Sequence, residues 1–287
     1  MTHPAIALRP IEDDDIQRVA EFLHRHLNQR IPPQTWATGI DPQWAPDAPN
    51  HGYMLIDNDH IVGVNVAFYS ERQIDGVVER VCNLGALCIL DGYRGHAVRL
   101  LRAILRQPNY TFTDLSPSGN VIELNLRLGF QLLNTDTVLV VNMPWPPRRS
   151  VTIVTDSTLI EPHLRGRDLQ IFRDHNSTAS QRMLIVESSQ HCLLIARRDR
   201  RKGLPLFMTV LYVSDPELFR RTCRRIFSHF LIRYGAPITL LEGRIVGNLR
   251  PAGSIALSRQ RPKMFKSQSL EVADIDYLYS ELTQIAW

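Results

Sequence analysis

The sequence predicts an α/β protein made of two consecutive domains: the first has a mixed β-sheet with helices on both faces, and the second is a similar α/β domain. The clearest observation is an apolar run over residues 84–90 that stops at Asp91-Gly92 and is followed by apolar residues at helical spacing up to Leu105. This pattern indicates a buried strand, a tight turn and a helix. The order of strands and helices in the first half recurs in the second. The length of 287 residues also favours two domains.

The first half, residues 1–143, is predicted to follow the order β-α-β-β-β-α-β-α-β. We expect strands over residues 5–10, 52–56, 61–70, 77–90, 110–115 and 131–143. We expect helices over residues 16–27, 97–105 and 120–128. The acidic run at residues 12–15 suits the start of the first helix, because carboxylates there meet the positive end of the helix dipole. Pro108 ends the second helix, and Gly129-Phe130 ends the third.

Residues 31–51 show weaker order, because five prolines interrupt any long element. Trp36 and Trp44 add aromatic surface to this segment. One interpretation is a lid or a wall that binds an acceptor substrate. The other is a loop that the two tryptophans pin to the core.

The proline-rich residues 144–150 predict a stiff linker and a domain boundary. The second domain, residues 151–287, is predicted to repeat the order of the first, which suggests a duplicated fold with little residue-level similarity. The expected strands are residues 151–160, 183–188, 192–198, 206–213 and 238–241. The expected helices are residues 161–175, 216–233 and a closing helix at 274–285.

Composition excludes several classes of protein. The cysteines, Cys82, Cys88, Cys192 and Cys223, form no C-x-x-C pair, so we expect buried free thiols rather than disulfides or a metal site. The N-terminus does not resemble a signal peptide, and no apolar run approaches the length of a membrane span. Neither a P-loop nor a dinucleotide-binding glycine motif occurs. We therefore expect a cytoplasmic protein that is not attached to a membrane.

Charge is divided unevenly between the halves. Residues 1–150 hold 13 basic and 16 acidic residues, whereas residues 151–287 hold 20 basic and 13 acidic residues. A basic second half is compatible with nucleic-acid binding, which would weaken steeply with salt. No aromatic residues are interleaved with these charges to stack on bases, so a solvated face is the preferred interpretation. The sequence leaves open whether the protein forms oligomers.

The turn before the second helix is a candidate anion site. Residues at a helix start have backbone N–H groups without intrahelical partners, and small side chains there let a phosphate approach. Residues 94–99 (RGHAVR) meet both conditions in part. They are the candidate cradle for an anionic group.

Two stretches resemble the GCN5-related N-acetyltransferase superfamily. The stretch around Tyr93-Arg94-Gly95-His96-Ala97 resembles that family's cofactor-binding turn, and residues 118–130 (SGNVIELNLRLGF) resemble its later helix. Both occur in the family's order with a strand between them. The resemblance covers roughly residues 5–143 and extends to a tandem arrangement if the second half is a similar copy.

The resemblance implies how acetyl-CoA or another acyl-CoA would bind. The backbone of Leu87, Cys88 and Ile89 would pair with the pantetheine arm, and the N–H groups of residues 94–99 would face the pyrophosphate. The cofactor-binding candidates are thus Leu87, Cys88, Ile89, Arg94, Gly95, His96, Ala97, Val98 and Arg99. Arg99 stands where the family usually has glycine, and we expect it to form a salt bridge with a phosphate. No metal is implied.

Catalytic residues are not identified by the resemblance. Asn125 occupies the position often held by a tyrosine acid, and the strand before the turn offers Asn83, with Glu79 further back, in place of a carboxylate base. In the second half the corresponding turn, residues 213–218 (VSDPEL), has neither glycine nor arginine. We expect that half to lack the cofactor site and to act as a scaffold or an acceptor-binding surface.

The sequence therefore favours an N-acyltransferase that moves an acetyl or other acyl group from acyl-CoA to the amine of a small molecule or sugar. The alternative is a catalytically silent protein of the same fold with a binding or regulatory role, which the missing tyrosine and carboxylate favour.

Overall fold

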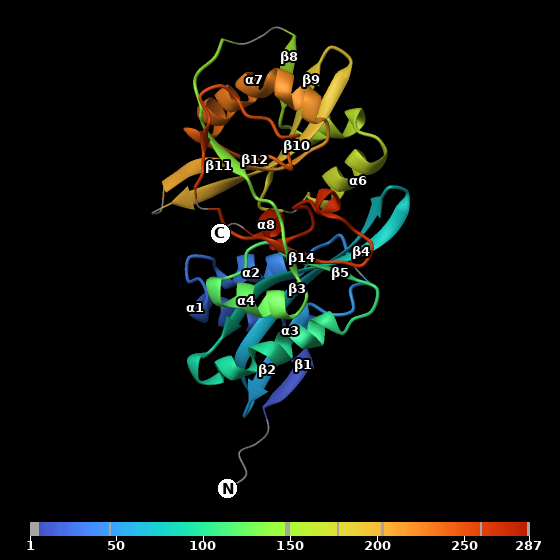
Figure 1. Cartoon of the computed structure of the whole chain (residues 1–287), viewed down its shortest axis with the longest axis vertical. Helices are drawn as coiled ribbons and strands as arrows, with labels where there is room; N and C mark the ends of the chain where they lie inside the picture. The colour runs from blue at the N-terminus through green and yellow to red at the C-terminus, as the bar shows by residue number, and fades with distance from the viewer. Residues whose placement is uncertain are drawn as a thin grey trace. The chain divides into compact units, whose positions relative to one another are not determined.

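The computed structural model describes residues 6–45, 47–146, 150–176, 178–201, 204–258 and 260–285 (Figure 1). These residues form two compact units. The first unit ends at Leu133 and regains residues 262–275 and 279–285 at the end of the chain. The second unit holds residues 134–261 and 276–278. Each unit is built on one seven-stranded sheet.

Among the described strands, the first sheet is antiparallel except for one parallel pair, β4 with β5. In spatial order its strands are β1 (Ala7–Pro10), β2 (Gly52–Asp57), β3 (His60–Ile74), β4 (Val77–Ile89), β5 (Thr111–Asp114), β14 (Met264–Lys266) and β6 (Gln131–Leu132).

Helices cover both faces of the first sheet, with α1 and α2 on one face and α3 and α4 on the other (Figure 1). The helical segments of this unit are η1 (Asp13–Asp15), α1 (Ile16–His26), α2 (Pro33–Ile40), η2 (Asp91–His96), α3 (Ala97–Leu105), α4 (Gly119–Arg127), η4 (Val272–Asp274) and α8 (Glu281–Gln284). Leu101 and Ile104 of α3 join Cys82, Leu84 and Phe112 of the sheet in one core cluster. The apolar spacing after the turn thus buries one side of α3, as the sequence predicts.

The second sheet has the same mixture, with β11 and β12 as its one parallel pair among the described strands. In spatial order its strands are β8 (Val151–Val154), β9 (Gln181–Glu187), β10 (Gln190–Arg201), β11 (Leu204–Val213), β12 (Ile238–Glu242), β7 (Thr137–Val141) and β13 (Ile255–Ala256). Its helical segments are α5 (Ser157–Ile160), η3 (Glu161–His163), α6 (Gly166–Asp174) and α7 (Pro216–Tyr234). One side of α7 packs on this sheet through a large apolar cluster that includes Leu218, Ile226 and Phe230.

Each sheet takes one strand from the other half of the chain. β14 follows the whole second unit in sequence, yet it lies between β5 and β6 in the first sheet. β7 precedes the rest of the second unit, and it lies between β12 and β13. Both sheets therefore have one topology: strands in chain order, then the exchanged strand, then a short edge strand. The predicted tandem α/β fold is confirmed, and the exchange is a feature that the sequence did not predict.

This exchange changes the predicted domain limits of 1–143 and 151–287. The residues predicted as the last strands of the first half separate into β6 of the first sheet and β7 of the second. Of the predicted linker 144–150, residues 147–149 lie outside the described residues. The boundary was misplaced because a local pattern shows that a segment is a strand, whereas its partner is chosen by long-range pairing.

The predicted closing helix at 274–285 is wrong. Residues there form the end of η4 and the short helix α8, because Tyr279 has a φ of +57° that interrupts a right-handed helix and Ser280 then caps α8. The apolar side chains that suggested the helix are nevertheless buried: Ile275, Leu278, Leu282 and Ile285. Their spacing indicated burial without indicating the backbone that produces it.

Three further segments differ from prediction in their backbone. β8 stops at Val154, because Asp156 accepts a hydrogen bond from the Thr158 N–H and starts α5. The predicted helix 161–175 divides into η3 and α6. Within residues 31–51, Pro33 occupies the first turn of α2, where proline is tolerated.

The tryptophans of residues 31–51 support the interpretation of a segment pinned to the core. Trp36 is fully buried, and Trp44 donates its ring N–H to the carbonyl of Tyr69 over 3.0 Å. The four cysteines are free and buried, as predicted. Among the helices of the described residues, none has the length and apolarity to cross a membrane.

Candidate functional site: a forked sheet with a buried carboxylate pair

The first sheet opens into a fork at the end of β5. β4 and β5 pair in parallel only from Val81 to Leu84, whose partner is Asp114 at the end of β5. β4 continues to Ile89, and along that stretch no strand of the described residues pairs with its far edge. Strand edges present unpaired N–H and C=O groups, so this edge can accept an extended ligand. Leu87, Cys88 and Ile89, three of the predicted cofactor-binding residues, lie on this edge.

A β-bulge lies on β4 within the fork. The pairing with β3 shifts between Val64 and Val66, where β4 uses one residue more than β3, and Ala86 has a φ of +48°. Such bulges bend a strand and interrupt its ladder of hydrogen bonds. The bulge therefore changes the direction of β4 where its free edge begins.

The turn after β4 is a 3₁₀ helix, η2, that leads directly into α3. The N–H of Tyr93 donates to the Leu90 carbonyl over 2.8 Å, and the N–H of Ala97 donates to the Arg94 carbonyl. A Cβ added to Gly95 would meet no atom within 4 Å, so open space lies in front of the turn. The N–H of Ala97 was predicted to donate to a phosphate, but it already donates to a carbonyl inside the turn.

The two long cations of the turn have internal partners. Arg94 forms an exposed ion pair with Asp91 at 2.7 Å. Arg99 donates to the Ile6 carbonyl over 3.0 Å and lies 3.2 Å from Nδ1 of His96. The Ile6 carbonyl is a neutral acceptor, which an anionic oxygen can displace with a gain in free energy. Val98 is half-buried beside them.

A cluster of buried polar groups lies at the base of the fork. Asp114 is 6% exposed and Glu281 of α8 is fully buried. Asn83 donates to Glu281, and so does the exposed Ser116 hydroxyl over 2.7 Å. Asn125 of α4 donates to Asp114 over 2.8 Å. We call Asp114 and Glu281 the carboxylate pair, and Asn83, Ser116 and Asn125 are its hydrogen-bond donors.

Burial and the nearby charge of Glu281 raise the pKa of Asp114 to about 7. The first cause is desolvation, since burial penalises the charged form of a carboxyl group. The hydrogen bond from Asn125 opposes the shift without cancelling it. Asp114 therefore changes protonation near neutral pH, where a general acid or base is most effective.

Asn125 offers a partner for either state of Asp114. Its Nδ2 donates to the carboxylate, and its buried Oδ1 has no hydrogen-bond partner among the described residues. A buried unsatisfied carbonyl is costly. When Asp114 is protonated, a flipped amide accepts the new O–H and satisfies that oxygen.

The weak catalytic candidates from the sequence separate into two groups. Asn83 and Asn125 both reach the carboxylate pair. Glu79 lies near the hairpin end of β4 and accepts a hydrogen bond from Ser269 over 3.0 Å, away from the pair. Sequence analysis missed Asp114, Ser116 and Glu281. Asp114 had one signal, as a single charge at the end of an apolar strand; Glu281 had none.

Within the described residues, no group of three His, Cys, Asp or Glu side chains could hold a metal ion.

No protein-family model matches the chain, and no curated protein matches it. Solved structures do. A Pyrococcus horikoshii protein provisionally assigned as an acetyltransferase is 13% identical with a TM-score of 0.58, covering 99% of this chain and 97% of its own. A GCN5-related N-acetyltransferase from Anabaena variabilis is 11% identical with a TM-score of 0.56, covering 91% and 72%. Eis1 from Mycobacterium abscessus is 12% identical with a TM-score of 0.54, covering 90% and 73%. The similarity in fold thus extends over both units.

Proposed function

We propose that this chain, which has the fold of the GCN5-related N-acetyltransferases, is an acyl-CoA-dependent N-acyltransferase whose site is the fork of the first unit. The observation that carries the proposal is the carboxylate pair, because it puts a group with a pKa of about 7 beside an open strand edge. Buried ionisable groups are costly, and they are found at active sites more often than elsewhere.

The fork suits the pantetheine arm of acyl-CoA, an extended chain that is attached to a pyrophosphate. The edge of β4 from Leu87 to Ile89 offers backbone groups to an amide-bearing arm, and the open space before Gly95 admits a larger group. Arg94 and Arg99 can contact the pyrophosphate when Arg94 breaks its ion pair with Asp91 and Arg99 breaks its hydrogen bond to the Ile6 carbonyl. Bound acyl-CoA supplies an acyl thioester, which a neutral amine can attack directly.

The amine loses a proton as its C–N bond to the acyl carbon forms and the C–S bond to CoA breaks. The carboxylate pair is suited to accept this proton, and CoA leaves as a thiolate that takes up a proton to become the free thiol. Above pH 7 Asp114 is ionised and can act as the base. Ser116 is exposed and hydrogen-bonded to Glu281, so its hydroxyl connects the surface to the buried pair. Asn83 and Asn125 hold the two carboxylates in place. The acceptor is proposed to be a small-molecule amine or an amino sugar in the cytoplasm.

Calorimetry and turnover together test the proposal. Titration with acetyl-CoA and with longer acyl-CoAs should give measurable heat, and incubation with a panel of amines and amino sugars should release free CoA thiol. Absence of heat at millimolar acyl-CoA would exclude the proposed function.

A silent protein of the same fold is the second candidate. The observation that favours it is that two groups of the turn already have partners. The N–H of Ala97 donates to the Arg94 carbonyl, and the Arg94 side chain is ion-paired with Asp91. Acyl-CoA binding without turnover on any amine would support this candidate, and turnover would exclude it.

A further inference from the structure

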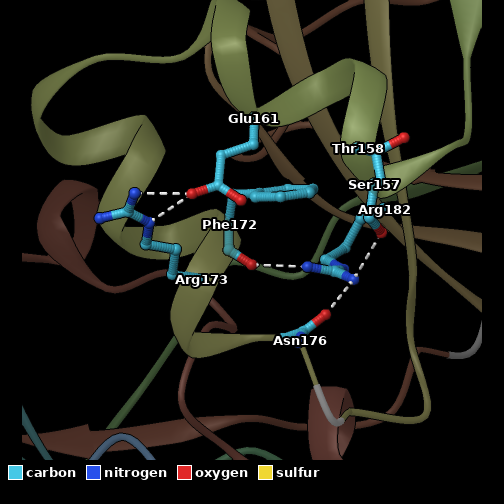
Figure 2. A pocket seen from close by; sticks show the side chains of 7 residues that line it. All are labelled: Ser157, Thr158, Glu161, Phe172, Arg173, Asn176 and Arg182. Carbon is cyan, nitrogen blue, oxygen red and sulfur yellow. Dashed lines mark hydrogen bonds and ion pairs between the residues drawn. The ribbon is translucent and has the colours of Figure 1, made fainter.

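The second unit contains a cavity of about 290 Å³ (Figure 2). It is open to solvent on one side and is lined by residues of α5, η3 and α6, by Asn176 and by the start of β9. Its lining residues are Ser157, Thr158, Glu161, Phe172, Arg173, Asn176 and Arg182. None of these residues belongs to the fork, so the cavity raises a question separate from the proposed function.

Arg182 is the central cation of this cavity. Its guanidinium lies over the ring of Phe172 at 4.2 Å from the ring centroid. It donates to the Phe172 carbonyl and to Oδ1 of Asn176, each over 2.7 Å, and to Oγ of Ser157 over 3.1 Å, as Figure 2 shows. All three acceptors are neutral. Partial burial lowers the pKa of Arg182, because the charged form is desolvated.

The carboxylate that lines the cavity is already paired. Glu161 accepts from Arg173 at 2.6 and 2.7 Å, in a two-pronged contact on the side of the cavity away from Asn176 (Figure 2). Asp156, next to the lining residue Ser157, accepts from the N–H and hydroxyl of Thr158. Within the lining residues, two arginines share one carboxylate, since Glu161 is ion-paired with Arg173 and its charge also acts on Arg182. The lining residues therefore carry a net charge of one positive unit.

We propose that this cavity binds a small monocarboxylate through Arg182. An anionic oxygen is a stronger acceptor for a guanidinium than a hydroxyl is, so a carboxylate displaces Ser157, the longest of the three contacts. The single excess charge matches a monoanion. The cavity has the volume of a small site, and the Phe172 ring provides an apolar wall for an aromatic or short aliphatic group.

Benzoate and its neutral isostere benzamide test the proposal on the full chain. Benzoate should bind, as measured by calorimetry and by shifts of amide resonances near Arg182, and benzamide should not. Arg182→Gln should weaken benzoate binding about 10-fold or more, the loss expected for a hydrogen bond to a charged group. Glu161→Gln removes the competing carboxylate and should strengthen binding. Arg220 of α7 is an exposed arginine outside the cavity, so Arg220→Gln is the matched control and should leave benzoate binding unchanged.

Three results would overturn the proposal. The first is benzamide binding as tightly as benzoate. The second is unchanged benzoate binding by a folded Arg182→Gln variant. The third is inorganic phosphate competing as well as benzoate does, which would assign the charge to a dianion. If Arg182→Gln does not fold, weaker rather than stronger binding by Glu161→Gln would also count against the monocarboxylate.

Discussion

The two units contain the same fork with different chemistry. In the first, the parallel strands part after Leu84 and Asp114; in the second, β11 and β12 part after Thr209 and Leu240. Each fork is followed by a shift in the pairing of its longer strand with the neighbour on the other side. The position of Asp114 thus corresponds to Leu240, and that of Asn83 to Met208. At these corresponding positions the first unit therefore has an ionisable side chain and the second an apolar one, although β12 of the second unit ends in the buried Glu242.

The turns that follow the two forks also differ in how well they could receive an anion. In the second unit, the side chain of Asp215 accepts from the N–H groups of Glu217 and Leu218 and so closes the start of α7 with a carboxylate. A negative charge there excludes another anion. In the first unit, η2 has no side-chain cap, and open space lies before Gly95. This difference supports the proposal that the first fork is the one that binds a ligand, and the absence of a cofactor site at residues 213–218 stays a prediction.

The largest expected effect is a loss of turnover when the ionisable side chain of the first fork is replaced by a neutral one. Asp114→Asn keeps the size of the side chain and removes the base, so turnover should fall by about 10²- to 10⁴-fold, the usual contribution of general-base catalysis. Leu240→Met, at the corresponding position of the second fork, should leave turnover unchanged. Steady-state release of CoA thiol measures both. Equal turnover of Asp114→Asn and the unchanged protein would remove Asp114 from the mechanism.

The exchanged strands predict the next effect. Met264 of β14 is fully buried in the core of the first unit, although it follows the second unit in sequence. Met264→Ala should reduce the free energy of unfolding by about 2 to 5 kcal/mol, because it leaves a cavity. Hydrogen exchange should quicken in β5 and remain slow in β12. Equal acceleration in both sheets would show that the units unfold together.

The pH dependence of stability follows from the raised pKa of Asp114. The folded state binds this proton up to a pH of about 7, whereas an unfolded aspartate releases it near its ordinary value of 3.8. Stability from this group is therefore fully present below the lower pKa and is lost as pH rises to about 7. As pH rises from 4 to 7, the unchanged protein should therefore lose stability relative to Asp114→Asn. Denaturant unfolding at pH 4, 5.5 and 7 measures that difference, and a constant difference would contradict the raised pKa.

The smallest effect concerns the turns. Asp215→Ala removes the cap of α7 and should cost about 1 kcal/mol of unfolding free energy. Asp91→Ala removes only an exposed ion pair with Arg94, so it should leave stability nearly unchanged. The same substitution frees Arg94 and should strengthen acyl-CoA binding in calorimetry. Weaker binding by Asp91→Ala would indicate that this ion pair holds the turn in a binding-competent form.

Local patterns in the sequence determined the elements whose residues are close together in the chain. The strand, turn and helix at residues 84–105 were predicted because apolar spacing changes from a continuous run to a helical period within one short stretch. The residues along the β4 edge and the catalytic candidates Asn83 and Asn125 were named from the resemblance to the acetyltransferase family, and their roles stay predictions. Glu79 was named as the carboxylate further back on the same strand.

Tertiary structure alone decided which distant segments complete the first unit. β14 joins β5 and β6, and Glu281 reaches Asn83 and Ser116, across more than 130 residues of intervening chain. No short-range period records such a pairing, since the free energy that selects it comes from burial and hydrogen bonds formed only when the chain is folded. The raised pKa of Asp114 has the same origin: a carboxyl group is acidic in the sequence, and only its burial beside a second carboxylate makes it titrate near neutrality.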